Sequence, residues 1–271
     1  MHLYSYNLLF LNKQFLMKQF SLIVIVFLLL FSIPATGQYY NTGQDPASLK
    51  WMQIRTPRFS VIYPKSYGDQ GVNFAKALDK AYSDLITLYP PLKFRIPVII
   101  HSYTTLSNGY VAWAPSRMEI YPTPEQNSIP LDADRQLALH ELTHVFQMES
   151  INQGFTRALS FVAGQQVTGV VSSLLPFWFL EGDAVFSESF FTGSGRGRTP
   201  SFQKELKAIM VEKSGIYRYD KILNGSFRDF VPDYYESGYQ MVAWADSKYG
   251  HELWGKTLST VAREPFLLNP V

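Results

Sequence analysis

The pentapeptide His140-Glu141-Leu142-Thr143-His144 constrains the fold of this chain more than any other stretch. The pattern of apolar residues around it is helical, and on an α-helix two histidines spaced four residues apart share a face. The opposite face of that helix carries an apolar stripe, formed by Ala138, Leu142, Val145 and Phe146. We therefore expect one face of the helix to lie in the core and the histidines to face a cleft.

Two histidines on one helical face can hold one metal ion, and the glutamate beside the first can reach a water bound to it. The chain contains no cysteine, so any metal must be held by histidines and carboxylates. A downstream motif, Trp178-Phe179-Leu180-Glu181-Gly182-Asp183-Ala184, offers the missing carboxylate in Glu181. Three protein ligands and a water form the open arrangement of catalytic zinc. The sequence thus predicts a Zn²⁺ site of His140, His144 and Glu181, with Glu141 as general base.

Two acids near Glu181 are candidates for the outer layer of this site. Metal-bound histidines usually donate their second N–H to a carboxylate or a carbonyl. Asp183 and Glu188 lie on the predicted helix of Glu181, and either is expected to orient an imidazole in this way. A solvated helix face is the alternative for each of the two acids.

A tyrosine hydroxyl is a common donor to the oxyanion that develops during acyl transfer. Tyr235 and Tyr239 share one face of a predicted helix; we favour Tyr239 for this role, with Tyr235 as the alternative. Packing in the core is the competing explanation for both rings. His101 and His251 have no partner at ligand spacing and are expected to be hydrogen-bonded or solvated.

At these residues the chain resembles the gluzincin metallopeptidases, in which HExxH is followed by a downstream glutamate ligand. Residues 178–184 look like the tryptophan and Glu-Gly-x-Ala pattern of the peptidase MA-like branch. Most of the chain beyond residue 37 is also similar to the N-terminal region of large exported bacterial proteins in which such a domain precedes a β-propeller. The resemblance implies zinc ligands His140, His144 and Glu181, Glu141 as catalytic acid/base, and substrate along an edge strand.

The chain departs from the family pattern in two places. The gap between His144 and Glu181 is longer than in thermolysin-like enzymes, so the stretch between them is an insertion beside the site. Residues 116–120 only partly match the Gly-x-Met-Glu-Asn strand of aminopeptidases. Glu119 is therefore expected to be a solvent-facing strand residue rather than a ligand for a substrate amino terminus.

The distribution of apolar residues predicts an α+β fold, with a small mixed sheet in the first half packed on a helical second half. Strands are expected at 59–63, 96–102, 110–113 and 117–121. Helices are expected at 72–88, from a cap at Asp132 or Asp134 through the histidines, and at 179–191, 202–212, 234–248 and 252–261. Residues 192–200 are glycine-rich, which is typical of a loop.

Residues 1–37 are expected to be a signal peptide. Lys13 and Lys18 precede an apolar run at 22–31, and Ala35-Thr36-Gly37 is a small-residue cleavage site; Met17 is an alternative start. Residues 38–271 are then expected to form one zincin-like domain of an exported protein, in the periplasm, at the outer membrane or outside the cell. The resemblance is compatible with a longer parent chain that continues into a β-propeller.

Residues 158–180 contain no Asp, Glu, Lys or Arg, and their length would allow a bilayer span. Their glutamines, serines, glycines and proline would be costly in lipid. This composition favours a buried or surface-dipping segment that can contact a membrane surface.

The formal net charge of +2 and the lack of a basic run argue against a nucleic-acid partner. The sequence predicts an exported zinc peptidase acting on peptide or protein substrates. An aminopeptidase rather than an endopeptidase is one alternative. The other is a non-proteolytic envelope assembly or binding module that retains the zinc site, because the uncharged insertion could close the cleft.

Overall fold

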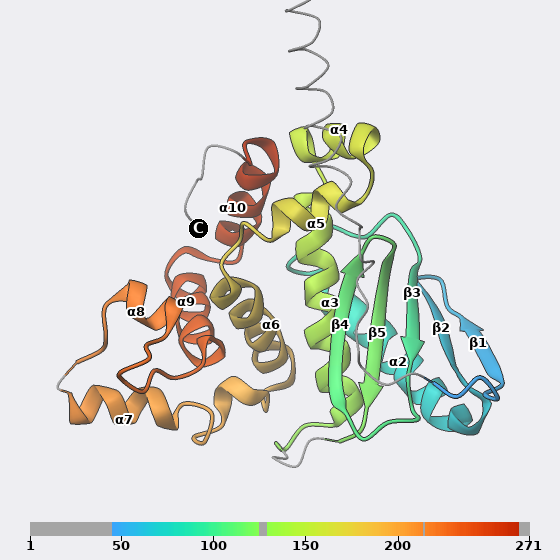
Figure 1. Cartoon of the computed structure of the whole chain (residues 1–271), viewed down its shortest axis with the longest axis horizontal. Coiled ribbons are helices and arrows are strands. Elements are labelled where there is room, and N and C mark those ends of the chain that lie inside the picture. Colours follow the sequence, from blue (N-terminus) through green and yellow to red (C-terminus); the bar gives the residue numbers. More distant parts are fainter. Residues whose placement is uncertain (1–44, 125–128, 214, 266–271) are drawn as a thin grey trace, which may run out of the picture. The chain divides into compact units, whose positions relative to one another are not determined.

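The computed structural model describes residues 45–124, 129–213 and 215–265. The signal peptide predicted at 1–37, with its alternative start at Met17, lies outside these residues. Within them a mixed sheet is followed by a mainly helical half (Figure 1). The predicted mixture of one sheet with helices, in that order along the chain, is confirmed.

Within the described residues the sheet has five strands in the order β1-β2-β3-β5-β4. They are β1 (Trp51–Arg55), β2 (Phe59–Pro64), β3 (Ile96–Ile100), β4 (Ser107–Trp113) and β5 (Ser116–Pro122). β2, β3 and β5 are parallel, whereas β1 and β4 run antiparallel to their neighbours. The four predicted strands are present. The sequence does not predict β1, because its side chains are mostly exposed and do not alternate between buried and exposed. β4 is an edge strand.

The helices of the described residues are α2 (Gly68–Leu85), α3 (Ala133–Ile151), α4 (Gly154–Ala163), α5 (Gln166–Ser172), α6 (Phe177–Thr192), α7 (Lys204–Glu212), α8 (Tyr219–Asn224), α9 (Tyr234–Tyr249) and α10 (Glu252–Arg263). The six predicted helices are all present. The sequence does not predict α4, α5 and α8 as separate elements.

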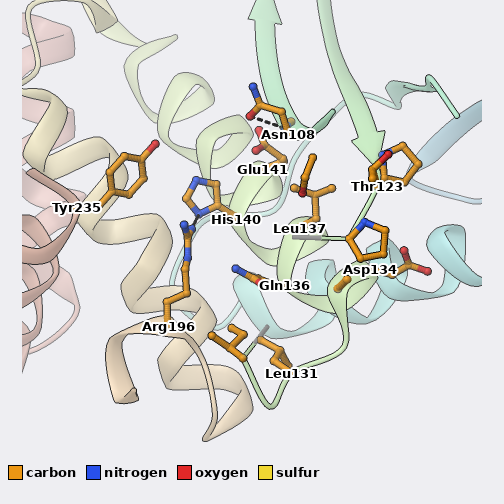
Figure 2. A pocket seen from close by; sticks show the side chains of 16 residues that line it. Asn108, Thr123, Leu131, Asp134, Gln136, Leu137, His140, Glu141, Arg196 and Tyr235 are labelled. Atoms are coloured by element: carbon orange, nitrogen blue, oxygen red, sulfur yellow. Dashed lines mark hydrogen bonds between the residues drawn. The ribbon is translucent and has the colours of Figure 1, made fainter. Parts of the chain in front are cut away.

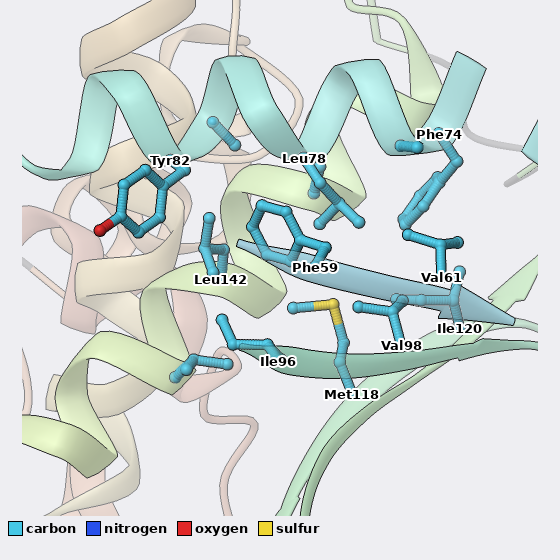
Figure 3. Packing of buried hydrophobic residues seen from close by; sticks show 14 of the residues in the cluster. Phe59, Val61, Phe74, Leu78, Tyr82, Ile96, Val98, Met118, Ile120 and Leu142 are labelled. Carbon is cyan, nitrogen blue, oxygen red and sulfur yellow. The ribbon is translucent and has the colours of Figure 1, made fainter. Parts of the chain in front are cut away.

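The core of the sheet half lies between one face of the sheet and helices α2 and α3 (Figure 3). Alternation along β2 turns Phe59 and Val61 inward, and Met118 does the same from β5. Leu78 of α2 and Leu142 of α3 pack against them. The apolar stripe of α3 is thus buried, as predicted.

Helix α3 begins at its predicted cap, because the Asp132 carboxylate accepts a hydrogen bond of 2.9 Å from the Arg135 backbone N–H. The helix runs between the sheet and α6 (Figure 1). It therefore joins the core of the sheet half to the helical half.

A second apolar cluster joins α6, α9 and α10 around Phe179, Val242 and Leu258. Two glycines set the spacing between α6 and α9. A Cβ atom built on Gly182 would lie 2.3 Å from the backbone carbonyl carbon of Gly238, so the two helix backbones touch. This contact places the second turn of α9 against the second turn of α6.

The uncharged segment 158–180 is only partly buried. Thr168, Val171 and Leu175 lie inside the protein, whereas the side chains of Phe161 and Val162 on α4 are 81% and 86% exposed. Among the described residues no single helix is long and apolar enough to cross a bilayer. The pair α5 and α6, which is bent by 94°, has the length and composition of a broken span. Of the two predicted alternatives, a buried or a surface-dipping segment, burial does not hold for these residues of α4.

His101 ties Asp45 to the face of the sheet opposite the helices. Its Nδ1 lies 2.6 Å from Asp45 Oδ2, and its Nε2 lies 2.6 Å from Glu119 Oε2. Glu119 also accepts a hydrogen bond from Arg117. His101 is therefore hydrogen-bonded, as predicted. The expectation that Glu119 faces solvent is wrong, because its partners leave its side chain 12% exposed.

Protonation of His101 is favoured in the folded protein. Burial lowers the pKa of His101, but the hydrogen bonds to Glu119 and Asp45 outweigh it and leave this pKa above 6.5. Burial would raise the pKa of Glu119, yet its hydrogen bonds to His101 and Arg117 bring it down to about 2. Glu119 thus stays ionised at every pH at which His101 titrates.

Replacing His101 with Gln should flatten the pH dependence of stability on the alkaline side. A raised pKa makes the contribution of His101 complete below pH 6.5 and lost as the pH rises through the folded-state pKa. Between about pH 5.5 and about pH 8.5, wild type should lose more free energy of unfolding than His101→Gln in urea titrations. Parallel curves for the two proteins would contradict this account.

Candidate metal centre

Helices α3 and α6 bring the two sequence motifs together. The Nε2 atom of His140 lies 3.1 Å from Glu181 Oε2, and the Nε2 atom of His144 lies 3.5 Å from the same oxygen. The two imidazole rings are 4.9 Å apart and nearly perpendicular, at 86°. Ligand atoms of the three residues lie within 4.8 Å of one another, so this group could hold a metal ion. The residues predicted as ligands do converge.

The imidazole of His140 is held from behind by Glu188. Its Nδ1 lies 2.7 Å from Glu188 Oε1, and the Glu188 side chain is fully buried. An Nδ1–H that donates to Glu188 leaves the lone pair of Nε2 directed at Glu181. Of the two acids predicted for this outer position, Glu188 makes the direct contact.

The imidazole of His144 is held by Gln147, one turn along α3. Its Nδ1 lies 2.9 Å from Gln147 Oε1, and Gln147 Nε2 donates to Asp183 Oδ2 at 2.8 Å. Tyr89 donates its hydroxyl to the same oxygen of Asp183. Asp183 therefore acts one hydrogen bond further out than predicted, because it orients Gln147 rather than an imidazole.

Arg196 reaches the site from the glycine-rich loop. Its guanidinium donates to both oxygens of Glu188, at 3.0 Å from Nε and 2.5 Å from Nη2. Nη2 also lies 2.8 Å from His140 Nδ1. When Nδ1–H of His140 donates to Glu188, it cannot also accept a hydrogen bond from Nη2 of Arg196, because both groups are donors. We therefore assign the hydrogen bonds of Arg196 to the Glu188 carboxylate, which brings Nη2 close to the ring. Arg196 thus balances the charge of a buried acid.

The electrostatic environment of the two imidazoles is acidic. Burial lowers the pKa of His140, but the hydrogen bonds to Glu181 and Glu188 prevail and raise it to about 9. Burial would raise the pKa of Glu181, whereas its hydrogen bonds to His140 and His144 hold it far below its usual value. The carboxylates that attract protons here would equally attract a cation.

Glu141 lies beside this group and is almost completely buried. Its Oε2 has no hydrogen-bond partner among the described residues, which is unusual for a buried carboxylate. β4 approaches so closely that a Cβ atom on Gly109 would lie 2.6 Å from Cδ of Glu141. The donor set, its outer partners and this unpaired oxygen together fit a metal site with a base next to it.

The tyrosine at the site is Tyr235. Its ring stacks on the imidazole of His140, with centroids 6.4 Å apart and planes 22° apart. Burial, followed by the charge of Glu181 and a hydrogen bond to it, raises the pKa of Tyr235 well above 10. Tyr239 lies against Gly197 and Phe202 instead, so the preference for Tyr239 is wrong and the alternative is the residue at the site.

Two adjoining pockets of about 240 and 250 Å³ open beside Glu141, and both are lined by Gly109, His140 and Tyr235. Figure 2 shows the first of them, with Arg196 and Tyr235 reaching His140 from one side and Asn108 lying near Glu141. The second pocket is lined more by apolar side chains, among them Val111, Met148, Leu175 and Phe177. A cleft thus passes along β4 on both sides of Glu141.

The other predicted residues lie away from this cleft. Glu119 and His101 are held in their own network, and neither lines the two pockets. His251 pairs with Asp246.

Two residues of the site, Gln147 and Arg196, are not among those predicted from the sequence. Gln147 follows His144 by one helical turn and could have been found from that spacing. No local pattern marks Arg196.

Metal affinity should fall in a fixed order when acids are removed. Glu181→Ala removes a ligand and should lower the affinity for Zn²⁺ most. Glu188→Gln removes an outer partner and should lower that affinity about 10- to 100-fold. Glu212→Gln, at an exposed position on α7, should match wild type. Competition with a chromophoric chelator measures each affinity for Zn²⁺. A Glu188→Gln protein as tight as Glu212→Gln would contradict the outer role.

Comparisons of this chain with family models, with curated proteins and with solved structures find no match. The side chains of the site, rather than relatives, must then indicate what the chain does.

Proposed function

We propose that this chain is an exported zinc-dependent peptidase of the gluzincin type, with a zincin-like fold and Glu141 as general base. The observation that carries the proposal is the convergence of the Nε2 atoms of His140 and His144 on Glu181. Each imidazole is fixed from behind by a protein partner, so both nitrogens are aimed before any ion binds. Such pre-orientation suits a site that must hold a metal firmly.

Zinc in this position would supply Lewis-acid chemistry, because it polarises a carbonyl and lowers the pKa of a bound water to near neutral. Glu141 accepts the proton of the attacking water and passes it to the leaving amine. The close approach of Gly109 confines the Glu141 carboxyl, which limits where it can meet that water. Tyr235, stacked on His140, donates to the oxyanion that forms on the substrate carbonyl.

An extended polypeptide is the substrate that the cleft suits best. β4 is an edge strand, and residues from its first half line both pockets. Its free edge can pair with a substrate strand through backbone hydrogen bonds. The apolar pocket around Val111, Met148 and Leu175 would take a hydrophobic side chain on one side of the scissile bond.

An endopeptidase is favoured over an aminopeptidase. The cleft continues on both sides of Glu141, so residues on both sides of the cleaved bond have room. Glu119, the residue that would bind a substrate amino terminus, is occupied by His101 and Arg117.

An open metal site also disfavours the alternative of a non-proteolytic module with a structural zinc. A structural zinc usually has four protein ligands, and the group of His140, His144 and Glu181 has three among the described residues. The insertion leaves the cleft accessible, since its residues Leu175 and Phe177 line one pocket without filling it. Export is proposed from the sequence of the first 37 residues alone.

Glu141→Gln should abolish peptide cleavage while the protein keeps its metal. The amide has the shape of the carboxyl but cannot accept the proton of the attacking water, so the loss should be at least about 100-fold in kcat. Cleavage of unfolded casein and zinc content by mass spectrometry measure the two effects. Protein that binds no zinc, or a Glu141→Gln variant that cleaves like wild type, would overturn the proposal.

Gly109→Ala should impair the same step from the other side of the cleft. The added methyl carbon would lie 2.6 Å from Cδ of Glu141, so the carboxyl must move away from its position. We expect a fall of about 10- to 100-fold in kcat, with zinc content unchanged. Gly255→Ala is the matched control, because nothing lies within 4 Å of its added methyl group. Equal activity of the two variants would show that the confinement of Glu141 is unimportant.

A further inference from the structure

One end of the described unit carries a set of exposed apolar side chains. Helices α4 and α5 meet there, toward the top of Figure 1, and the chain runs on from α5 to the start of α6. The exposed residues of α4, of α5 and of the stretch leading into α6, which we call the apolar ridge, are Phe161, Val162, Val170, Leu174 and Phe177. A cluster of this kind marks a surface that another body covers.

The apolar ridge lacks the charges that normally keep such helices in solution. No Asp, Glu, Lys or Arg occurs from residue 158 to residue 180, and the polar residues there are Gln, Ser and Thr. Glutamine, serine and threonine can form hydrogen bonds at the headgroup level of a bilayer without bringing in a charge. The composition of the segment suits an interface between water and lipid.

A basic pocket adjoins the apolar ridge. Lys93, Arg95 and Arg157 line a cavity of about 480 Å³, together with Ser160 and Thr168 of α4 and α5. Within the described residues none of these three cations forms an ion pair. Glu149 is the single acid in the lining, so the cavity carries a positive balance. Its size and polar hydroxyls suit a phosphate headgroup.

We propose that the apolar ridge and the basic pocket together dock this protein onto a membrane surface that contains anionic phospholipid. The side chains of Phe161 and Val162 enter the boundary of the acyl chains, and a lipid phosphate accepts hydrogen bonds in the basic pocket. The helices lie on the surface and do not cross it. The docking is independent of whether the metal centre is active.

Charge decides between a membrane and a second copy of this chain. A two-fold dimer through the apolar ridge would place the same patch of both copies face to face, and thus bring two basic pockets near each other. Such a dimer would have to overcome repulsion between two sets of Lys93, Arg95 and Arg157. An anionic lipid surface complements both features.

Vesicle binding tests the proposal. Residues 45–271 are the protein to use, because both apolar clusters lie within them and the apolar run at 22–31 would itself bind lipid. We expect cosedimentation with vesicles of phosphatidylglycerol and phosphatidylcholine, weaker binding to phosphatidylcholine alone, and weakening with salt. Absence of binding to the anionic vesicles would overturn the proposal.

Variants locate the binding surface. The double variant Phe161→Asp with Val162→Asp should lower the bound fraction at least about tenfold. Val211→Asp is the matched control, since Val211 is 81% exposed on α7, outside the apolar ridge. Arg157→Glu should reduce binding to anionic vesicles more strongly than it reduces binding to phosphatidylcholine vesicles. Equal binding of the double variant and Val211→Asp would overturn the proposal. So would a loss of self-association, without a loss of lipid binding, in the double variant.

Discussion

A buried polar seam between α3 and α6 holds the two halves of the molecule together. It consists of hydrogen bonds from His140 to Glu188 and from Gln147 to Asp183, and Tyr89 joins it at Asp183. Loss of one partner would leave a buried polar group unsatisfied, which costs about 1–3 kcal/mol. The same hydrogen bonds orient both imidazoles. Folding of the two halves and alignment of the metal ligands therefore depend on one set of contacts.

Glycines bring backbones close to this seam at three places. Gly109 lets β4 approach Glu141, Gly182 lets α9 contact α6, and Gly197 lies against the ring of Tyr239. At none of the three does a positive φ require glycine; the lack of a side chain does. The glycine-rich loop is accordingly packed on α6, where the Gly197 N–H donates to Ser189. That packing is what delivers Arg196 to Glu188.

The sequence predicts the strands other than β1, six of the helices and the convergence of the ligands, because these follow from local periodicity and from the chemistry of side chains at fixed spacing. It could not separate Tyr235 from Tyr239, which share one helix face. The position of α9 along its own axis decides between them, and the contact of Gly182 with Gly238 helps to fix that position. Arg196 arrives from a loop whose path depends on tertiary packing, so no spacing rule identifies it. The exposure of α4 is also a tertiary result, since hydropathy does not say whether a partner covers an apolar helix.

Phe177 belongs to two surfaces at once. It is exposed on the apolar ridge, and it lines the apolar pocket of the cleft. It is also the first residue of α6, one helical turn before Glu181 and on the same face. A partner or surface that binds Phe177 therefore restricts the motion of the helical turn that carries the metal ligand Glu181. Mechanical coupling between the outside of this protein and its metal centre needs only that single turn of helix.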